Sequence, residues 1–146
     1  MIDIPVLRLD DGLELPAAAR DGDAGIDLRS RVDLVLGPAG GRALVPTGLA
    51  VEVPPGLAGL VLPRSGLALS HGVTVLNAPG LIDAGYRGEV SVILVNTDPV
   101  SEFEVKRGDR VAQLVVVAVE AVRLDAVYEL SPTERGTGGF GHSGRR

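Results

Sequence analysis

The chain has 146 residues, a length that suits one domain with a real core and is short for two. It is 45% hydrophobic but only 3% aromatic, so we expect Val, Leu, Ile and Ala to fill the core. The net charge of −5 without any basic run argues against a binder of nucleic-acid backbones, and the absence of cysteine excludes disulfides and zinc–thiolate sites.

Short segments rich in Val and Leu alternate with the 20 glycines and 10 prolines, and this punctuation predicts an all-β protein. In chain order, the predicted strands cover residues 4–8, 26–30, 32–36, 42–46, 49–53, 57–62, 73–76, 89–96, 103–105 and 110–119. Residues 122–128 either continue the last strand or form one more. One short helix is expected at residues 65–70. Many short strands in one domain of this size indicate a single-domain, distorted jelly-roll β-barrel.

The last part of the chain differs in composition from the rest. Ser131 and Pro132 break the strand pattern, and glycine dominates residues 136–144. We therefore expect a β-barrel domain over residues 1–130 and a flexible tail over residues 131–146. Ordering so many glycines costs much entropy, so the tail is either a disordered terminus or a lid whose peptide N–H groups bind phosphate oxygens.

The N-terminus and the apolar runs bear on location. The first residues, MIDIP, lack the basic and apolar regions of a signal peptide. The longest clean apolar run, residues 114–119, is far shorter than a membrane span. We expect a cytoplasmic protein that contacts neither membrane nor nucleic acid.

The strongest chemical signal lies in residues 77–89, which read NAPGLIDAGYRGE. This segment places the carboxylate of Asp83 in a glycine-bounded turn, with Tyr86 three residues later and Asn77 six residues earlier. Asp83 could orient and deprotonate a water molecule, and the Tyr86 ring could present a flat wall to a sugar or base. The alternative is an ordinary hairpin with a solvated aspartate.

Five short segments in a fixed order resemble the five motifs of the trimeric dUTP diphosphatase (dUTPase) family. They span residues 24–144 and read AGIDL at 24–28, PRSGLA at 63–68, GLIDAGYRGE at 80–89, GDRVAQL at 108–114 and RGTGGFGHSG at 135–144. The resemblance implies the jelly-roll fold and a homotrimer whose sites are shared between subunits. It also implies hydrolysis of dUTP to dUMP and pyrophosphate with Mg²⁺, which keeps uracil out of DNA and supplies dUMP for dTMP synthesis.

The same resemblance assigns a role to individual residues. Asp83 would be the general base that activates water for attack at the α-phosphorus. Asp27 would contact Mg²⁺ through water, although it could equally serve as a turn or cap acceptor. The implied substrate-binding residues are Arg64, Ser65, Gly66, Asn77, Gly80, Leu81, Ile82, Tyr86, Gln113, Arg135, Gly139 and Phe140.

Within that set the resemblance separates phosphate, base and sugar contacts. Residues 64–66 match a phosphate-binding loop, Gln113 a residue near the terminal phosphates, and Arg135 an arginine finger. Asn77 and the peptides from Gly80 onward would read uracil, while Phe140 would stack on it. The Tyr86 ring would lie under the deoxyribose and leave no room for a 2′-hydroxyl. Asp109 and Arg110 are expected to pair with each other or across subunits.

Two positions depart from the common family pattern, and other functions remain as alternatives. Ile26 stands where an aromatic residue is frequent, and His142 stands where Ser or Thr is usual. A dCTP deaminase shares the fold but uses a glutamate to activate water, so Asp83 followed by Tyr86 fits it less well. A non-catalytic barrel that binds a nucleotide or a protein, or a purely structural jelly roll, leaves the motifs unexplained.

Overall fold

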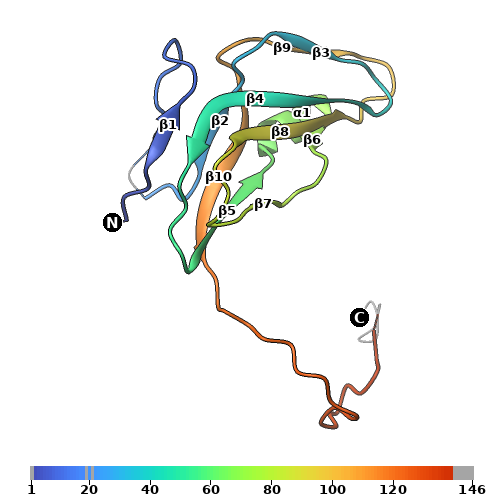
Figure 1. The fold of residues 1–146 in the computed structure, drawn as a ribbon. Helices are drawn as coiled ribbons and strands as arrows, with labels where there is room; N and C mark the ends of the chain where they lie inside the picture. Colours follow the sequence, from blue (N-terminus) through green and yellow to red (C-terminus); the bar gives the residue numbers. More distant parts are fainter. Residues whose placement is uncertain (1, 19, 21, 140–146) are drawn as a thin grey trace.

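The computed structural model describes residues 2–18, 20 and 22–139, and within these residues the fold is β-structure with one short helix (Figure 1). The helix α1 covers Ser65–His71. The strands are β1 (Val6–Arg8), β2 (Ile26–Arg29), β3 (Leu34–Leu36), β4 (Gly41–Val51), β5 (Leu57–Leu62), β6 (Val73–Val75), β7 (Gly80–Ile82), β8 (Glu89–Asn96), β9 (Phe103–Val105) and β10 (Arg110–Ala118). The predicted all-β class and the position of the helix are confirmed.

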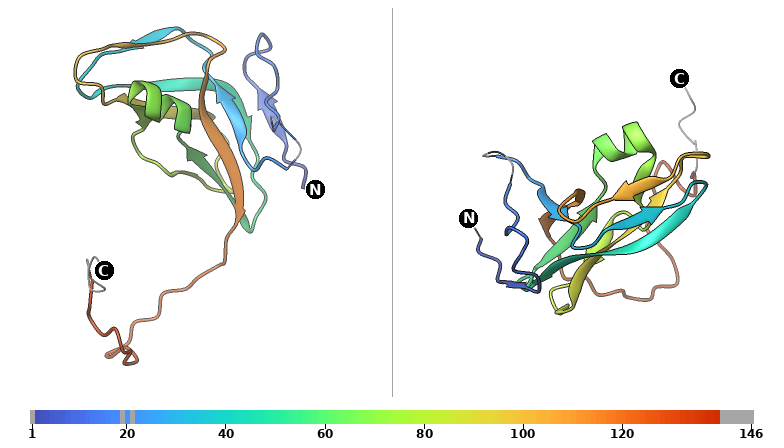
Figure 2. Two further views of the ribbon diagram at one scale, coloured as in Figure 1. Left: turned by 180° about the vertical axis from the view of Figure 1, so that it is seen from behind. Right: turned by 90° about the horizontal axis from the view of Figure 1, so that it is seen from above.

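The strands form three antiparallel sheets, and the core lies between the two larger ones (Figures 1 and 2). One sheet has the order β1-β4-β8-β6, the second has the order β2-β10-β5-β7, and β3 pairs with β9. In the described residues these sheets do not join into a closed barrel, so the expected barrel is better described as an open jelly-roll sandwich. The short strands of the sequence allow two small sheets to stack in this way.

The core is aliphatic, as the scarcity of aromatic residues predicted. Strand β8 shows the alternation that makes it so, because Val90, Val92 and Leu94 are buried while Ser91 and Ile93 are half-buried. Leu28 of the second sheet and Val45 of the first belong to the same buried cluster. Each fully buried Val or Leu contributes roughly 1.5–3 kcal/mol, so this cluster is the main source of stability.

Strand β4 corrects one prediction. The sequence predicted two strands, at residues 42–46 and 49–53, because Pro46 and Gly48 resemble a turn. The structure has one strand, Gly41–Val51, whose pairing with β8 shifts register between Pro46 and Ala50. Gly48 adopts a φ of 74° at this bulge, a conformation that glycine tolerates and that bends the strand without ending it.

Two further expectations differ from the structure. Strand β7 was not predicted, because its three residues lie inside a glycine-rich motif that reads as loop. Residues 122–128, which were expected to extend β10 or to form another strand, contain no strand. β10 ends at Ala118, and residues 119–139 run away from the sheets (Figures 1 and 2).

Among the described residues, three polar side chains are almost fully buried, namely Ser30, Thr47 and Asn96, and each has a hydrogen-bond partner. Asn96 donates to the carbonyls of Leu36 and Ser101, at 3.2 and 2.8 Å. Thr47 donates to the carbonyl of Val90 at 2.6 Å. These bonds tie β8 to β3 and to β4, so the strand that follows the glycine-rich hairpin has a fixed frame.

The end of the chain lies partly outside the described residues. Residues 140–146, which include Phe140, His142 and the second half of the fifth motif, are not among them. The division of the chain at residue 130 therefore stays a prediction. Within the described part, no helix is long and apolar enough to span a membrane.

Candidate active site

Strand pairing gathers the first, second and fourth motifs on one sheet. In the β2–β10–β5 register, Gln113 stands opposite both Asp27 and Leu62, and Arg64 follows β5 by two residues. The Gln113 side chain packs over Gly25, because a Cβ placed on Gly25 would lie 3.3 Å from the Gln113 carboxamide. Residues far apart in the sequence therefore meet at one point of the sheet.

Asp27 is the centre of this cluster, which we call the arginine cluster (Asp27, Arg64, Arg110 and Gln113). Its carboxylate lies 3.2 Å from Nε of Arg64 and 3.0 Å from Nη1 of Arg110. Arg64 also donates to the carbonyl of Arg110 at 3.0 Å. One carboxylate thus holds two guanidinium groups side by side and leaves one positive charge in excess, which suits a polyanion.

The two carboxylate oxygens of Asp27 are not equivalent. Oδ2 accepts a hydrogen bond from Arg110, whereas Oδ1 is buried and accepts none from the described residues, although it lies within ion-pair distance of Arg64. A buried oxygen without a donor is costly unless another group reaches it. Asp27 lies inside strand β2 and faces arginines, so the structure gives no support to the alternative role as a turn or cap acceptor.

The partner of Arg110 differs from the expected one. It pairs with Asp27, and Asp109 instead accepts the N–H of Lys106 at 2.9 Å. The expected pair between Asp109 and Arg110 of one chain is therefore not formed in the structure. Arg110 lines two depressions, of about 230 and 200 Å³, and its side chain is 46% exposed.

The phosphate-loop candidates Ser65 and Gly66 begin helix α1 and are exposed. Arg64 precedes them in an extended conformation with φ −93° and ψ 125°. A Cβ on Gly66 would meet no atom within 4 Å, so the space over this residue is open.

The third motif forms a separate pocket of about 140 Å³ beside β7. Five of the predicted residues line it, namely Asn77, Gly80, Leu81, Ile82 and Tyr86, together with valines of β5, β6 and β8. Pockets for drug-sized ligands are typically about 300–1,000 Å³, so this one suits a single small ring. Gly80 keeps this space free, because a Cβ there would lie 3.3 Å from the Asn77 amide.

The loop between β7 and β8 carries Asp83, which directly follows Ile82, a lining residue of this pocket. Asp83 is exposed, and its carbonyl accepts the N–H of Tyr86 at 3.0 Å, which closes the turn. The Tyr86 hydroxyl donates to the carbonyl of Glu89 at 2.9 Å. Arg87 donates to the carbonyls of Ala84 and Tyr86 and pairs with Glu52 at 3.0 Å.

The structure does not bring the two halves of the predicted site together within one chain. Among the described residues, no hydrogen bond or ion pair joins Asp83 to the arginine cluster. Arg135 folds back on its own turn and donates to the carbonyl of Gly138 at 2.7 Å, and Gly139 is exposed on the same outlying segment. The pocket beside β7, the arginine cluster and the tail are thus three separate parts.

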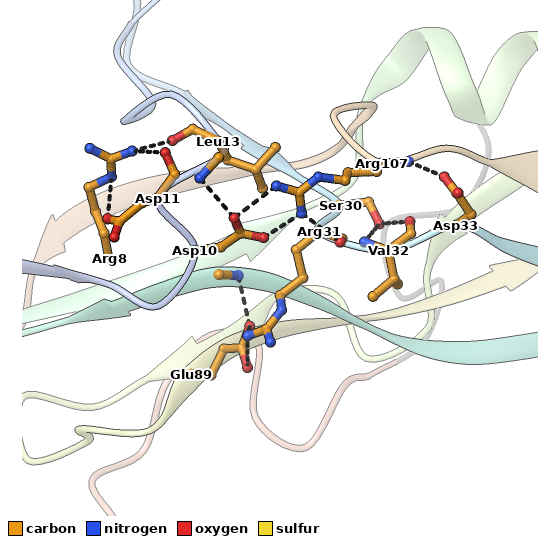
Figure 3. Close-up of polar contacts among 12 residues, drawn as sticks. Arg8, Asp10, Asp11, Leu13, Ser30, Arg31, Val32, Asp33, Glu89 and Arg107 are labelled. Carbon is orange, nitrogen blue, oxygen red and sulfur yellow. Dashed lines mark hydrogen bonds and ion pairs between the residues drawn. The ribbon is translucent and has the colours of Figure 1, made fainter.

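Sequence reasoning missed a polar network behind the hairpin (Figure 3). Arg31 pairs with Glu89, and Arg107 pairs with Asp10 and donates to the carbonyl of Arg31 at 2.9 Å. The Arg107 side chain holds the pKa of Asp10 at about 2, below its ordinary 3.8. Glu89 was visible at the end of the third motif, but nothing in the sequence marks Arg31 as its partner.

Comparisons with known proteins agree with this arrangement. A sequence model of the dUTPase family matches residues 11–144. A deoxyuridine 5'-triphosphate nucleotidohydrolase of Mycobacterium leprae is 55% identical over 146 residues, covering 97% of this chain and 94% of the relative. One of the same name from Nocardia farcinica is 53% identical over 141 residues, covering 97% and 85%.

Solved structures give the same answer. The dUTPase of Staphylococcus bacteriophage 80alpha with dUPNHPP aligns with a TM-score of 0.91 and 29% identity over 99% of both chains. A mutant dUTPase of S. aureus phage phi11, described with a structural Mg(II) ion, aligns with a TM-score of 0.80 and 26% identity over 88% of this chain and 98% of that one. Motifs, fold and relatives coincide along the chain, which therefore belongs to the dUTPase family.

Proposed function

We propose that this chain hydrolyses dUTP to dUMP and pyrophosphate. The observation that carries the proposal is that one chain has both a pocket for a single ring, with Asp83 directly after its lining residue Ile82, and two arginines held by one carboxylate. Relatives of 55% and 53% identity carry the name of this activity, and a structural neighbour was solved with dUPNHPP. In a cell the reaction would keep uracil out of DNA and supply dUMP for dTMP synthesis.

Asp83 is the general base of the proposed reaction. It accepts a proton from water while the water oxygen bonds to the α-phosphorus, and the bond from the α-phosphorus to the bridging oxygen breaks to release pyrophosphate. The hydrogen bond from the Tyr86 N–H to the Asp83 carbonyl closes the turn, so the backbone that carries the carboxylate is held in place.

Charge on the triphosphate is met by Arg64, Arg110 and Arg135, with Ser65, Gly66 and Gln113 as further donors. Arg64 and Arg110 are already held by Asp27, so they lose little freedom when phosphate binds. Arg135 and Gly139 belong to the tail, which runs away from the sheets and can bring its peptide N–H groups to the phosphates. Phe140 would stack on the base.

Mg²⁺ fits the residues present if it binds mainly through substrate oxygens. Among the described residues, no group of three His, Asp or Glu could hold a metal ion, so the protein does not supply a cage. The Oδ1 of Asp27 is buried without a hydrogen-bond donor and can accept from a metal-bound water. Bound there, Mg²⁺ would offset phosphate charge.

Uracil is read by the hairpin pocket. Asn77 and the peptides from Gly80 to Ile82 can pair with the donor and acceptors of uracil, and cytosine would leave buried groups unpaired. The small volume leaves no space for the methyl group of thymine. In our proposal, the hydrogen bond of the Tyr86 hydroxyl holds the ring in place, and a 2′-hydroxyl on the sugar would clash with this ring.

A homotrimer explains why one chain keeps the parts of the site apart. The arginine cluster of one subunit, the hairpin of a second and the tail of a third would complete each site. Six large hydrophobic residues of the outlying segment are exposed and would be covered by a neighbour; they are Val119, Val122, Leu124, Val127, Tyr128 and Leu130.

The decisive experiment measures pyrophosphate release with Mg²⁺ from dUTP, dCTP, dTTP and UTP. We expect turnover of dUTP alone and a fall in kcat of about 10²–10⁴ for Asp83→Asn, because removal of a general base costs that much. Binding of a non-hydrolysable dUTP analogue should change little. Asp11→Asn is the matched control, since the Asp11 side chain is 95% exposed and lies in the N-terminal loop.

Each other result has a definite meaning. Equal turnover by wild type and Asp83→Asn would remove Asp83 from the mechanism. No pyrophosphate from any nucleotide would overturn the proposed function, and ammonia released from dCTP would then identify a deaminase.

A further inference from the structure

Glu89 is the first residue of β8 and ends the hairpin that carries Asp83 and Tyr86. Its side chain is 25% exposed and points back toward β4 and the start of the β2–β3 loop. The carboxylate lies 3.1 and 3.2 Å from Nη1 of Arg31 and accepts the N–H of Gly48 at 2.7 Å (Figure 3). The proposed reaction gives this half-buried contact no role.

The bond from Gly48 explains why an acceptor is needed at residue 89. Gly48 lies in the bulge of β4, where the pairing with β8 shifts between Pro46 and Ala50, so its N–H has left the regular ladder. Its φ of 74° lies outside the range of strand residues. Glu89, which stands opposite Ala50, supplies the acceptor that the ladder lacks.

Arg31 is held from both sides and therefore forms a fixed anchor. Its own N–H donates to the carbonyl of Pro46 at 3.0 Å, and its carbonyl accepts from Arg107 at 2.9 Å. Arg107 also pairs with Asp10, which ties the anchor to the N-terminal loop (Figure 3). The Glu89 carboxylate consequently has two partners that cannot easily follow it if it moves.

The backbone of Glu89 transmits this constraint to Tyr86. The Tyr86 hydroxyl donates to the Glu89 carbonyl at 2.9 Å, and the ring lies against Gly88, where an added Cβ would be 2.5 Å from the hydroxyl oxygen. Tyr86 is 43% exposed, and its hydroxyl is tethered to the Glu89 carbonyl. Its ring angle depends on where the backbone of residues 88 and 89 is held.

We propose that Glu89, clamped by Arg31 and the N–H of Gly48, is a positioning residue that sets the orientation of Tyr86 and thereby the rejection of ribonucleotides. The inference rests on the proposed function and adds a determinant of sugar selectivity outside the nucleotide contacts. Glu89 itself does not touch the substrate. If the ion pair only stabilised the fold, breaking it would lower the melting temperature of the variant without changing which sugar the variant accepts.

The first test compares kcat/KM for dUTP and UTP in Glu89→Gln, Glu89→Leu and Arg31→Met. The selectivity for dUTP should fall about tenfold or more in Glu89→Leu, a size typical for the loss of a wall that excludes one small group. Glu89→Gln keeps an oxygen that can accept from Gly48 and should lose less. Glu104→Gln is the matched control, because it breaks the exposed ion pair between Glu104 of β9 and Lys106 and should leave selectivity unchanged.

A second test needs no turnover. The chain has no tryptophan and two tyrosines, so Tyr128→Phe leaves Tyr86 as the only strong intrinsic fluorophore. In that background, Glu89→Leu should change the emission of Tyr86 and increase its quenching by acrylamide, whereas Glu104→Gln should not. Circular dichroism verifies that each variant retains the β-fold.

The outcomes separate the two proposals. Unchanged selectivity together with unchanged Tyr86 fluorescence in folded Glu89→Leu and Arg31→Met would overturn the positioning role. If wild type fails to hydrolyse dUTP, the proposed function is wrong, and the fluorescence test alone decides whether Glu89 orients Tyr86.

Discussion

Among the glycines of the hairpin, Gly88 has the most restricted space. A Cβ on it would lie 2.5 Å from the Tyr86 hydroxyl oxygen and 2.7 Å from the ring carbon that bears it. Gly85, three residues earlier in the same loop, has no atom within 4 Å of the corresponding point. The two glycines therefore differ in purpose, because only Gly88 makes room for an aromatic ring.

We predict that Gly88→Ala displaces the Tyr86 ring and lowers kcat/KM for dUTP by about tenfold or more, since misplacing a positioning group is costly. Gly85→Ala should keep kcat/KM within about twofold of wild type, because a Cβ at residue 85 meets no atom within 4 Å. Steady-state kinetics on both variants checks this. Equal effects of the two substitutions would mean that the ring position over Gly88 does not matter.

At the scale of elements, Arg107 joins the N-terminal loop to the turn between β9 and β10. Its guanidinium pairs with Asp10, and its backbone N–H donates to Asp33 at 2.6 Å (Figure 3). The side-chain hydrogen bond from Arg107 lowers the pKa of Asp10 to about 2. The ion pair between Arg107 and Asp10 depends on the ionised form of Asp10, so it responds to acid.

The direction of the acid response follows from the lowered pKa. Ionised Asp10 stabilises the fold above pH 3.8, and this contribution is lost as the pH falls from 3.8 through about 2. The melting temperature of wild type should therefore drop more steeply across this window than that of Asp10→Asn. The difference should be modest, because the pair is open to solvent. In Asp11→Asn the melting temperature should fall with pH as steeply as in wild type. If the melting temperature of wild type changes as little with pH as that of Asp10→Asn, the pair between Asp10 and Arg107 does not contribute to stability.

Strand β4 marks how far elements could be predicted from neighbouring residues. Segments rich in Val and Leu, bounded by glycines and prolines, located β5, β8 and β10 closely. The same rules divided β4 at Pro46 and Gly48. Whether such a pair makes a turn or a bulge depends on β8 and on the Glu89 carboxylate, which supplies the acceptor for Gly48.

At the scale of the whole molecule, the proposed site is divided between surfaces that one chain does not bring together. Asp83 lies on the hairpin, and Arg64 belongs to the arginine cluster on the β2–β10–β5 side. If a trimer joins them, Asp83 and Arg64 of one site come from different subunits. Two inactive variants would then complement each other.

We predict that trimers assembled from equal amounts of Asp83→Asn and Arg64→Ala regain about one quarter of wild-type activity, since one in four sites receives both native residues. Each variant alone should be inactive. Co-refolding followed by a pyrophosphate assay and sedimentation analysis measures both activity and assembly. No recovery in mixed trimers would mean that both residues of a site come from the same chain.

The sequence alone determined the all-β class, the helix after Arg64 and the residues of the hairpin pocket. Asn77, Gly80, Asp83 and Tyr86 lie within ten residues of one another, so turn chemistry brings them together with little help from the rest of the fold. The order of the five motifs also identified the family. These features are local or are simple patterns along the chain.

Only the tertiary structure decided which charged groups meet. Asp27 and Arg110 are 83 residues apart, and Arg31 and Glu89 are 58 apart, so their pairing depends on strand order and register. A shift of one residue would turn each side chain to the opposite face of its sheet. The arginine cluster and the clamp on Glu89 therefore follow from packing of the two sheets, a long-range property that no local pattern encodes.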